Sequence, residues 1–159
     1  MSIGNSDGIG HSELVSCLCL IPSMSGAEAY MASGDTRGDV KIWNATNGEL
    51  VAGLSHSQFV SEMMCYEDAA AGQPVLIIAL KNAGFVLRSC ATMAILFIIS
   101  PSAVGLGNSV QALANLGMAC FASAGDDGDV AVWRIAIPIV EAPQQQQQQQ
   151  GQQQVVAVR

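Results

Sequence analysis

The sequence predicts an all-β fold, and three observations carry that prediction. First, the phrase SGDTRGDVKIW at residues 33–43 recurs as SAGDDGDVAVW at residues 123–133. Second, Trp43 and Trp133 are 90 residues apart, which is twice 45, and a weaker middle copy lies between them at residues 79–89. Third, the apolar runs are short, and a fixed period near 45 residues with four short strands is typical of propeller blades. We therefore expect a partial β-propeller of about three four-stranded antiparallel blades.

The first repeat, about residues 10–54, supports four strands in order. Residues 40–43 alternate between apolar and polar side chains, as a half-buried strand does. Asn47 and Gly48 form the strongest hairpin dipeptide of the chain. The four expected strands cover residues 14–21, 29–33, 40–43 and 49–54.

The second and third repeats, about residues 55–100 and 105–137, show the same order less clearly. Residues 109–116 are the one stretch where an amphipathic helix competes with a strand. The expected strands of the second repeat cover residues 59–65, 74–80, 85–89 and 94–99. Those of the third repeat cover residues 109–115, 118–123, 130–133 and 135–137.

Both ends of the chain differ in composition from the repeats. Residues 1–9 are small and polar, so we expect a flexible N-terminus. Residues 138–159 combine prolines with a glutamine tract that begins at Gln144 and is interrupted by Gly151. Such low-complexity, polyglutamine composition cannot bury apolar surface, so it predicts a disordered tail that tends toward β-association.

Composition limits the classes of function. The chain carries 13 acidic and six basic residues, a net charge of −7, which argues against direct nucleic-acid binding because phosphate backbones need clustered Lys and Arg. The longest apolar run, residues 93–99, is too short to span a membrane. The N-terminus lacks a signal-peptide pattern, so we expect a cytoplasmic or nuclear protein.

The five cysteines predict neither a disulfide framework nor a metal site. Their number is odd, and Cys17 and Cys19 are spaced to share one face of a strand rather than to form a zinc knuckle. We expect buried, inert thiols, no metal and no cofactor.

The repeated residues resemble the WD40 repeat (β-propeller) family, in which a Gly-His pair precedes two strands, a Ser-bearing strand, an Asp-bearing turn and a strand that ends in Trp-Asp. The resemblance covers about residues 10–136 as three degenerate copies, and Asn44 replaces the usual Asp. The residues that carry it are Gly10, His11, Ser33, Gly38, Trp43, His56, Gly84, Ser123, Asp127, Gly128 and Trp133.

The resemblance implies a hydrogen-bonded chain of His, Ser, Asp and Trp that ties each blade together. In the first repeat Arg37 stands at the Asp position, with Asp35 as a stand-in two residues away. In the second repeat Ser89 is expected at the Trp position. The third repeat lacks the His, because Asn108 occupies its place.

A closer likeness is to plant WD40 proteins that carry CCCH zinc fingers. It lies in the phrase QPVLII at residues 73–78 ahead of the poorly kept strand at residues 84–88. The fingers are absent here, so neither zinc nor RNA binding is carried over.

Catalytic interpretations are weaker than structural ones. His11 and His56 stand where the repeat needs a structural His, and no nucleophile with an adjacent base can be assigned. Asp126, Asp127 and Asp129 resemble the start of a calcium loop, but the Glu that such a loop requires is missing. We expect a non-enzymatic protein.

Propellers of this family serve mainly as platforms for proteins or peptides, so the resemblance implies a scaffold. The turns place Asp35, Thr36, Arg37, Asp126 and Asp127 on one acidic rim, which predicts a basic partner. Three units cannot close a ring, so we expect a fragment of a larger propeller or self-association through open blade edges. The alternative function is a regulatory component of an RNA or transcription complex in which the Gln-rich tail drives association.

Overall fold

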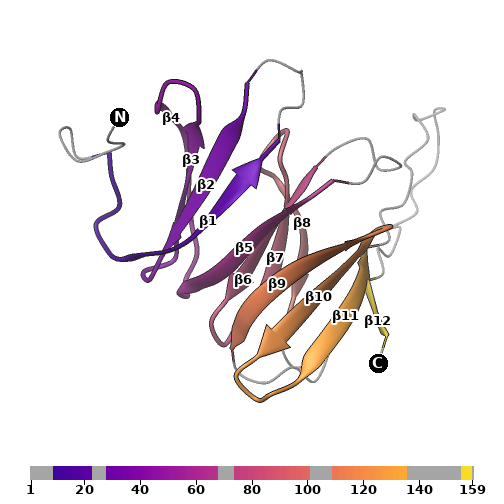
Figure 1. The fold of residues 1–159 in the computed structure, drawn as a ribbon. Coiled ribbons are helices and arrows are strands. Elements are labelled where there is room, and N and C mark those ends of the chain that lie inside the picture. The colour runs from indigo at the N-terminus through magenta and orange to yellow at the C-terminus, as the bar shows by residue number, and fades with distance from the viewer. Residues whose placement is uncertain (1–8, 23–27, 68–73, 101–108, 136–154, 159) are drawn as a thin grey trace, which may run out of the picture.

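The chain forms three four-stranded antiparallel sheets, seen in a computed structural model (Figure 1). The structure describes residues 9–22, 28–67, 74–100 and 109–135 and the backbone of 155–158. The described residues contain strands and turns and no helix, so the predicted all-β, partial-propeller fold is confirmed. Residues 109–116, where a helix competed in the sequence, belong to a strand.

Each sheet is a meander of consecutive strands, and we call the sheets blades 1, 2 and 3. Blade 1 contains β1 (Val15–Ile21), β2 (Tyr30–Asp35), β3 (Asp39–Asn44) and β4 (Leu50–Ser55). Blade 2 contains β5 (Val60–Tyr66), β6 (Val75–Leu80), β7 (Gly84–Ser89) and β8 (Ile95–Ile99). Blade 3 contains β9 (Val110–Gly117), β10 (Cys120–Gly125), β11 (Val130–Ile135) and β12 (Val155–Val158).

Strand β12 lies within the segment 138–159, for which the sequence predicts a disordered tail. Its four residues pair antiparallel with β11 and supply the fourth strand of blade 3. Without β12 the outer side of β11 would be an unpaired strand edge, and the Val-rich sequence has a high β-propensity. The predictions for residues 1–8 and 138–154 concern parts of the chain outside the described residues.

Strand pairing also corrects the alignment of the second repeat. Met31 pairs with Trp43 on blade 1, and Phe121 pairs with Trp133 on blade 3. The equivalent residue on blade 2, Leu76, pairs with Arg88. The Trp position of blade 2 is therefore held by Arg88 and not by Ser89.

The glycine of the second turn is displaced as well. Gly38 and Gly128 lie two residues before the strand residues Val40 and Val130, and both have positive φ angles. In blade 2 this position is Ala83, whereas Gly84 is the first residue of β7. Positive φ angles fall instead on Asn82 and Gly84, so the turn reverses the chain with different residues.

Two apolar cores lie between the blades. The first joins the facing sides of blades 1 and 2, and the second joins those of blades 2 and 3. At the centre of the second core the ring of Phe85 packs edge-on against Phe121 and Trp133, with centroid distances of 5.8 and 5.3 Å. Because the chain has few aromatic residues, these three supply much of the bulk of that core.

Strand β6 reflects its place in the middle of the stack. Blade 2 is covered on both sides, and every residue of β6 is buried. A strand buried on both faces needs a continuous apolar run rather than an alternating one, which explains the sequence VLIIAL. The same constraint makes blade 2 the least tolerant of polar substitution.

A substitution at Gly38 tests the close contact between the β2–β3 turn and the segment that enters blade 2. Its φ is +104°, and a Cβ added there would lie 2.2 Å from the carbonyl oxygen of His56. Gly128 has a φ of +85° and no atom within 4 Å of the same position. We expect Gly38→Ala to lower the free energy of unfolding by more than the roughly 1–2 kcal/mol of strain expected for Gly128→Ala. Equal losses in urea denaturation would contradict the predicted clash.

Candidate functional site

A chain of four polar side chains runs through blade 1. Nε1 of Trp43 donates to Oγ of Ser33 over 2.7 Å, and Oγ of Ser33 lies 2.6 Å from Nε2 of His11. Nδ1 of His11 lies 2.8 Å from Oδ2 of Asp35. With the imidazole protonated at Nδ1, every donor that links these four side chains meets an acceptor. The chain ties β2, β3 and the segment before β1 together.

Local backbone contacts hold each member in place. Ser33 and Asp35 lie two residues apart on β2 and therefore on one face, next to Trp43 on the neighbouring strand. Nζ of Lys41 donates to the carbonyl oxygens of Ile9 and Gly10 over 2.6 and 2.7 Å, which fixes the segment that presents His11.

Asp35 is the anion of the chain, the stand-in that the sequence suggested, and its burial corrects the prediction that it lies on the rim. Its Oδ1 accepts backbone N–H bonds from Arg37, Gly38 and Asp39 at 2.9–3.0 Å, so it also caps the turn. Burial opposes ionisation, but the bonds from Asp39, His11 and Arg37 hold the pKa of the Asp35 carboxyl below its ordinary value. Arg37 does not join the chain, and Asp35 is buried rather than exposed on the rim.

The order Ser33, His11, Asp35 has the connectivity of a catalytic triad, so access decides its role. Ser33 is only 4% exposed, and its Oγ already accepts the indole N–H of Trp43. Asp35 is fully buried. A nucleophilic serine must reach a substrate carbonyl next to oxyanion donors, and this hydroxyl is enclosed. The geometry supports a structural role for His11.

Blade 3 keeps one link of the chain. Nε1 of Trp133 donates to Oγ of Ser123 over 2.8 Å. The position equivalent to Asp35 is Gly125, and a Cβ there would lie 2.6 Å from Oδ1 of Asp127. Asp127 is exposed and accepts the N–H of Asp129 at 3.0 Å. Asp127 therefore caps the turn. It does not join the polar chain, although the repeat pattern predicts that it would.

Blade 2 has lost the chain and keeps only its His. The positions of Ser33 and Asp35 are Ile78 and Leu80, both in the core between blades 1 and 2. His56 places Nδ1 at 3.2 Å from the carbonyl oxygen of Gly38, while its buried Nε2 has no hydrogen-bond partner among the described residues.

Arg88, at the Trp position of blade 2, is only partly satisfied as well. Its Nη1 donates to the carbonyl oxygen of Met93 over 2.6 Å, but its buried Nε has no partner. Burial lowers the pKa of His56, and the charge of Arg88 lowers it further, while the bond to Gly38 opposes both. Burial also lowers the pKa of Arg88. The charge of Arg88 therefore disfavours the charged form of His56.

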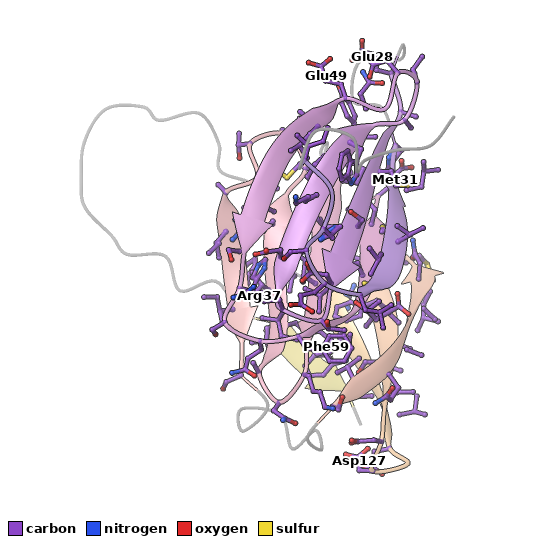
Figure 2. The ribbon with its side chains drawn as sticks, turned by 90° about the vertical axis from the view of Figure 1, so that its left-hand side faces the viewer. Glu28, Met31, Arg37, Glu49, Phe59 and Asp127 are labelled. Carbon is purple, nitrogen blue, oxygen red and sulfur yellow. The ribbon has the colours of Figure 1, made fainter. Side chains whose placement is uncertain are left out.

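The β2–β3, β6–β7 and β10–β11 turns are each bound to a segment that enters a blade, and we call this side the turn end. His56 N donates to Gly38 O over 2.9 Å, Lys81 N to Phe59 O over 2.9 Å, and Asp126 N to Ser109 O over 3.1 Å. Figure 2 shows Arg37, Phe59 and Asp127 toward this end and Glu28 and Glu49 at the opposite one. Of the predicted rim, Arg37, Asp126 and Asp127 are exposed and Thr36 is half-buried.

The charged side chains at the turn end differ in whether they contact an opposite charge or an aromatic ring. Arg37 lies 4.0 Å from Glu13, and Lys81 lies over the ring of Phe59 at 5.7 Å. The exposed aspartates of blade 3 form no ion pair among the described residues. They are Asp126, Asp127 and Asp129. The uncompensated negative charge is therefore concentrated on blade 3.

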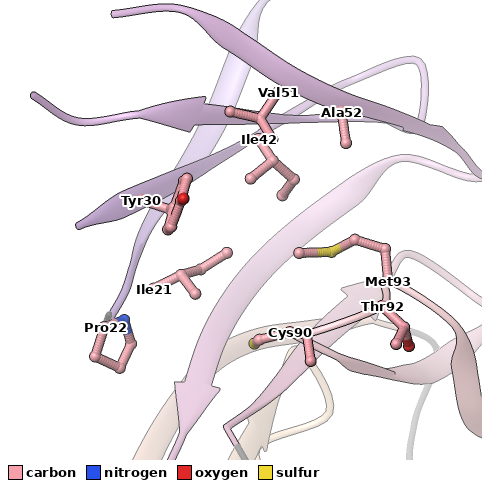
Figure 3. A pocket seen from close by; sticks show the side chains of 10 residues that line it. Ile21, Pro22, Tyr30, Ile42, Val51, Ala52, Cys90, Thr92 and Met93 are labelled. Atoms are coloured by element: carbon pink, nitrogen blue, oxygen red, sulfur yellow. The ribbon is translucent and has the colours of Figure 1, made fainter. Parts of the chain in front are cut away.

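A cavity of about 360 Å³ lies between blades 1 and 2 on the side away from the turn end. Figure 3 shows Ile42 and Ala52 on the blade 1 side and Cys90 and Met93 on the blade 2 side. Its lining is mainly apolar, and no cluster of metal-ligating side chains occurs in the described part of the chain.

The cysteines of the core between blades 1 and 2 are thiols. Burial raises the pKa of Cys17 to about 11 and that of Cys19 to about 12. A hydrogen bond with Cys90, 3.7 Å away, and burial raise the pKa of Cys65 well above its ordinary value. Because the thiolate is the reactive form, these groups are poor nucleophiles. As the sequence suggested, Cys17 and Cys19 pack on one face of β1.

The fold is an all-β, partial propeller, and comparisons with solved structures support a WD40-like fold. The computationally designed Ika4 protein matches with a TM-score of 0.61 and 19% identity, over 80% of this chain and 69% of that chain. A chain of the Chaetomium thermophilum Polycomb Repressive Complex 2 bound to GSK126 matches with a TM-score of 0.62 and 19% identity, over 77% and 29%. U3-55K matches with a TM-score of 0.60 and 18% identity, over 79% and 37%.

These matches establish the fold, and the last two are WD40 propeller proteins. The chain spans about a third of the length of those two proteins. No family model matches the sequence, and neither does any curated protein. The neighbours give no support for the closer likeness to plant proteins with zinc fingers. No helix long and apolar enough to cross a membrane occurs among the described residues.

Removing the central hydroxyl tests the polar chain of blade 1. Ser33→Ala removes the partner of Nε1 of Trp43 and of Nε2 of His11, whereas Ser123→Ala removes only the partner of Nε1 of Trp133. Each buried unsatisfied group costs about 1–3 kcal/mol, so we expect the larger loss of stability for Ser33→Ala. Urea denaturation followed by tryptophan fluorescence measures both. A larger loss for Ser123→Ala would refute the assigned hierarchy.

The lowered pKa of His56 predicts a dependence of stability on pH. The unfolded chain binds a proton at His56 near pH 6.5, while the folded chain resists it. Stability from this residue is therefore complete above about pH 6.5 and is lost as pH falls through the lower folded-state pKa. His56→Leu should flatten the stability profile between pH 7 and 5. An unchanged slope, measured by denaturation at several pH values, would show that His56 is not the group responsible.

Proposed function

We propose that this chain is a non-enzymatic interaction module that binds a basic segment of a protein or peptide at its turn end. The observation that carries the proposal is the exposed aspartate group of blade 3, formed by Asp126, Asp127 and Asp129. This group lies at the turn end, where the cationic side chains of Arg37 and Lys81 already have Glu13 and Phe59 as partners. The net charge of −7 favours the approach of a basic partner over an acidic one.

A rigid support favours binding through the turns. The β2–β3 turn is fixed by four hydrogen-bonded side chains and by the backbone bonds of Asp35. The β10–β11 turn is held by Asp127 and by the bond from Asp126 N to Ser109 O. Turns held in place lose little conformational entropy when a partner binds. Enclosure of Ser33 and Asp35 and the raised pKa values of the thiols support a non-enzymatic role.

The glutamine tract supplies a second candidate, association driven by the tail. The tract lies between β11 and β12, which pair with each other, so deleting residues 144–159 would also remove a strand of blade 3. Replacing the glutamines of residues 144–154 with a Gly-Ser sequence and keeping β12 separates the two effects. Partner recovery that depends on the tract alone would favour the alternative.

Charge neutralisation at the turn end tests the main proposal. The probe is a fluorescent lysine-rich peptide, measured by anisotropy at several salt concentrations. We expect wild-type binding that weakens with salt, and at least a fivefold weaker affinity for the double variant Asp126→Asn/Asp127→Asn.

The matched control is Glu28→Gln/Glu49→Gln, which removes the same charge from the opposite end. It should retain most of the affinity. Equal losses in both double variants would mean that net charge alone governs binding, and the proposed site would be rejected. Thermal unfolding of each variant checks that the fold is intact.

A further inference from the structure

The face of blade 3 that points away from blade 2 is apolar and uncovered. Val130 corresponds in the strand register to Val40 of blade 1 and Phe85 of blade 2. Val40 and Phe85 are fully buried beneath the next blade, whereas Val130 is 72% exposed. Val132 is likewise exposed at the position of Ile42 and Leu87, which are buried. Blade 3 thus presents the kind of surface that blades 1 and 2 use to receive their neighbour.

The face of blade 1 that points away from blade 2 is the complementary kind. Leu18 lies opposite Ser33, in the register position that Met63 holds on blade 2. Met63 is buried in the core between blades 1 and 2, whereas Leu18 is 60% exposed. Leu20, two residues further along β1, is also exposed. Blade 1 thus presents the kind of surface that blade 2 places against its predecessor.

We propose that the occupant of each open face is the opposite open face of a second copy of this chain. The blade 1–blade 2 and blade 2–blade 3 contacts already join these two kinds of surface twice within one molecule. A third contact of the same kind, blade 3 on blade 1 of the next copy, continues an interface that the fold has built. The proposal rests on the fold and not on the binding of a basic partner.

The predicted contact is head-to-tail, because the two surfaces differ. Such heterologous contacts close into a ring where the rotation permits and otherwise extend into a filament. Each copy keeps its turn end free, since the blade faces and the turn end are different sides of the molecule. The contact buries Leu18 and Val130 as the equivalent residues Met63, Val40 and Phe85 are buried within the chain.

Two complementary variants test the direction of the contact. Val130→Glu blocks the blade 3 face and leaves the blade 1 face intact, while Leu18→Glu does the reverse. Both residues are exposed in one chain, so neither change disturbs its packing. By light scattering and analytical ultracentrifugation we expect wild-type protein to exceed its monomer mass of 16.5 kDa as concentration rises.

Each variant alone should be monomeric, and an equimolar mixture should form a one-to-one complex through the two intact faces. Ile98→Glu, at an exposed apolar residue of blade 2, is the control and should associate as the wild type does. A monomeric wild type at all concentrations would overturn the proposal. A mixture that stays monomeric would also overturn the proposal. Association of one variant alone would overturn it as well, because it would indicate contact between two like faces.

Discussion

The structure depends on the burial of the apolar faces that neighbouring four-stranded sheets turn toward each other. A sheet with two apolar faces is stable only where another layer covers each of them, and the stack here provides two such layers. Blade 2 satisfies this requirement from both sides, and its residues supply most of the fully buried positions. Hydrogen bonds and turns act within that arrangement, and the polar chain satisfies the buried groups on the face of blade 1 that points away from blade 2.

A comparison of the polar chain of blade 1 with the equivalent positions of blade 2 shows that hydrogen-bonded polar groups and apolar side chains can fill the same positions. In blade 1, Ser33 and Asp35 lie on the face with no preceding blade, and hydrogen bonds from His11 and Trp43 satisfy them. In blade 2 the same positions, Ile78 and Leu80, pack directly against blade 1. Replacing both members of a buried polar pair by apolar groups is nearly neutral, whereas removing one member is not. The two blades therefore fill these two positions in different ways, blade 1 with hydrogen-bonded polar groups and blade 2 with apolar side chains.

The sequence predicted the blades because their signals are local. Short apolar runs, the turn glycines and the repeat period follow from strand and turn geometry, and each blade contains its own copy. The role of Asp35 was harder to predict, because the repeat pattern aligns Arg37 with Asp127, whereas the carboxylate that joins the polar chain lies two residues earlier, at the end of β2. The Trp position of blade 2 was placed one residue late, because the alignment followed Gly84 while the turn there uses Asn82 as well. Strand β12 was missed because 19 residues separate it from its partner strand, and a contact over that distance leaves no periodic signal.

Two half-buried polar side chains of blade 2, His56 and Arg88, lower the stability of the most deeply buried blade. His56 keeps the His position and Arg88 replaces the Trp, while the Ser and Asp positions are apolar. Both His56 and Arg88 have a buried nitrogen with no hydrogen-bond partner among the described residues. An unsatisfied buried donor or acceptor costs more than its hydrogen bond would contribute, so these two groups oppose the packing around them. Because Arg88 also disfavours protonation of His56, the penalty grows as pH falls. The first opening of the stack on acidification is therefore expected between blades 1 and 2, where His56 meets the turn of Gly38, and not in the aromatic core between blades 2 and 3.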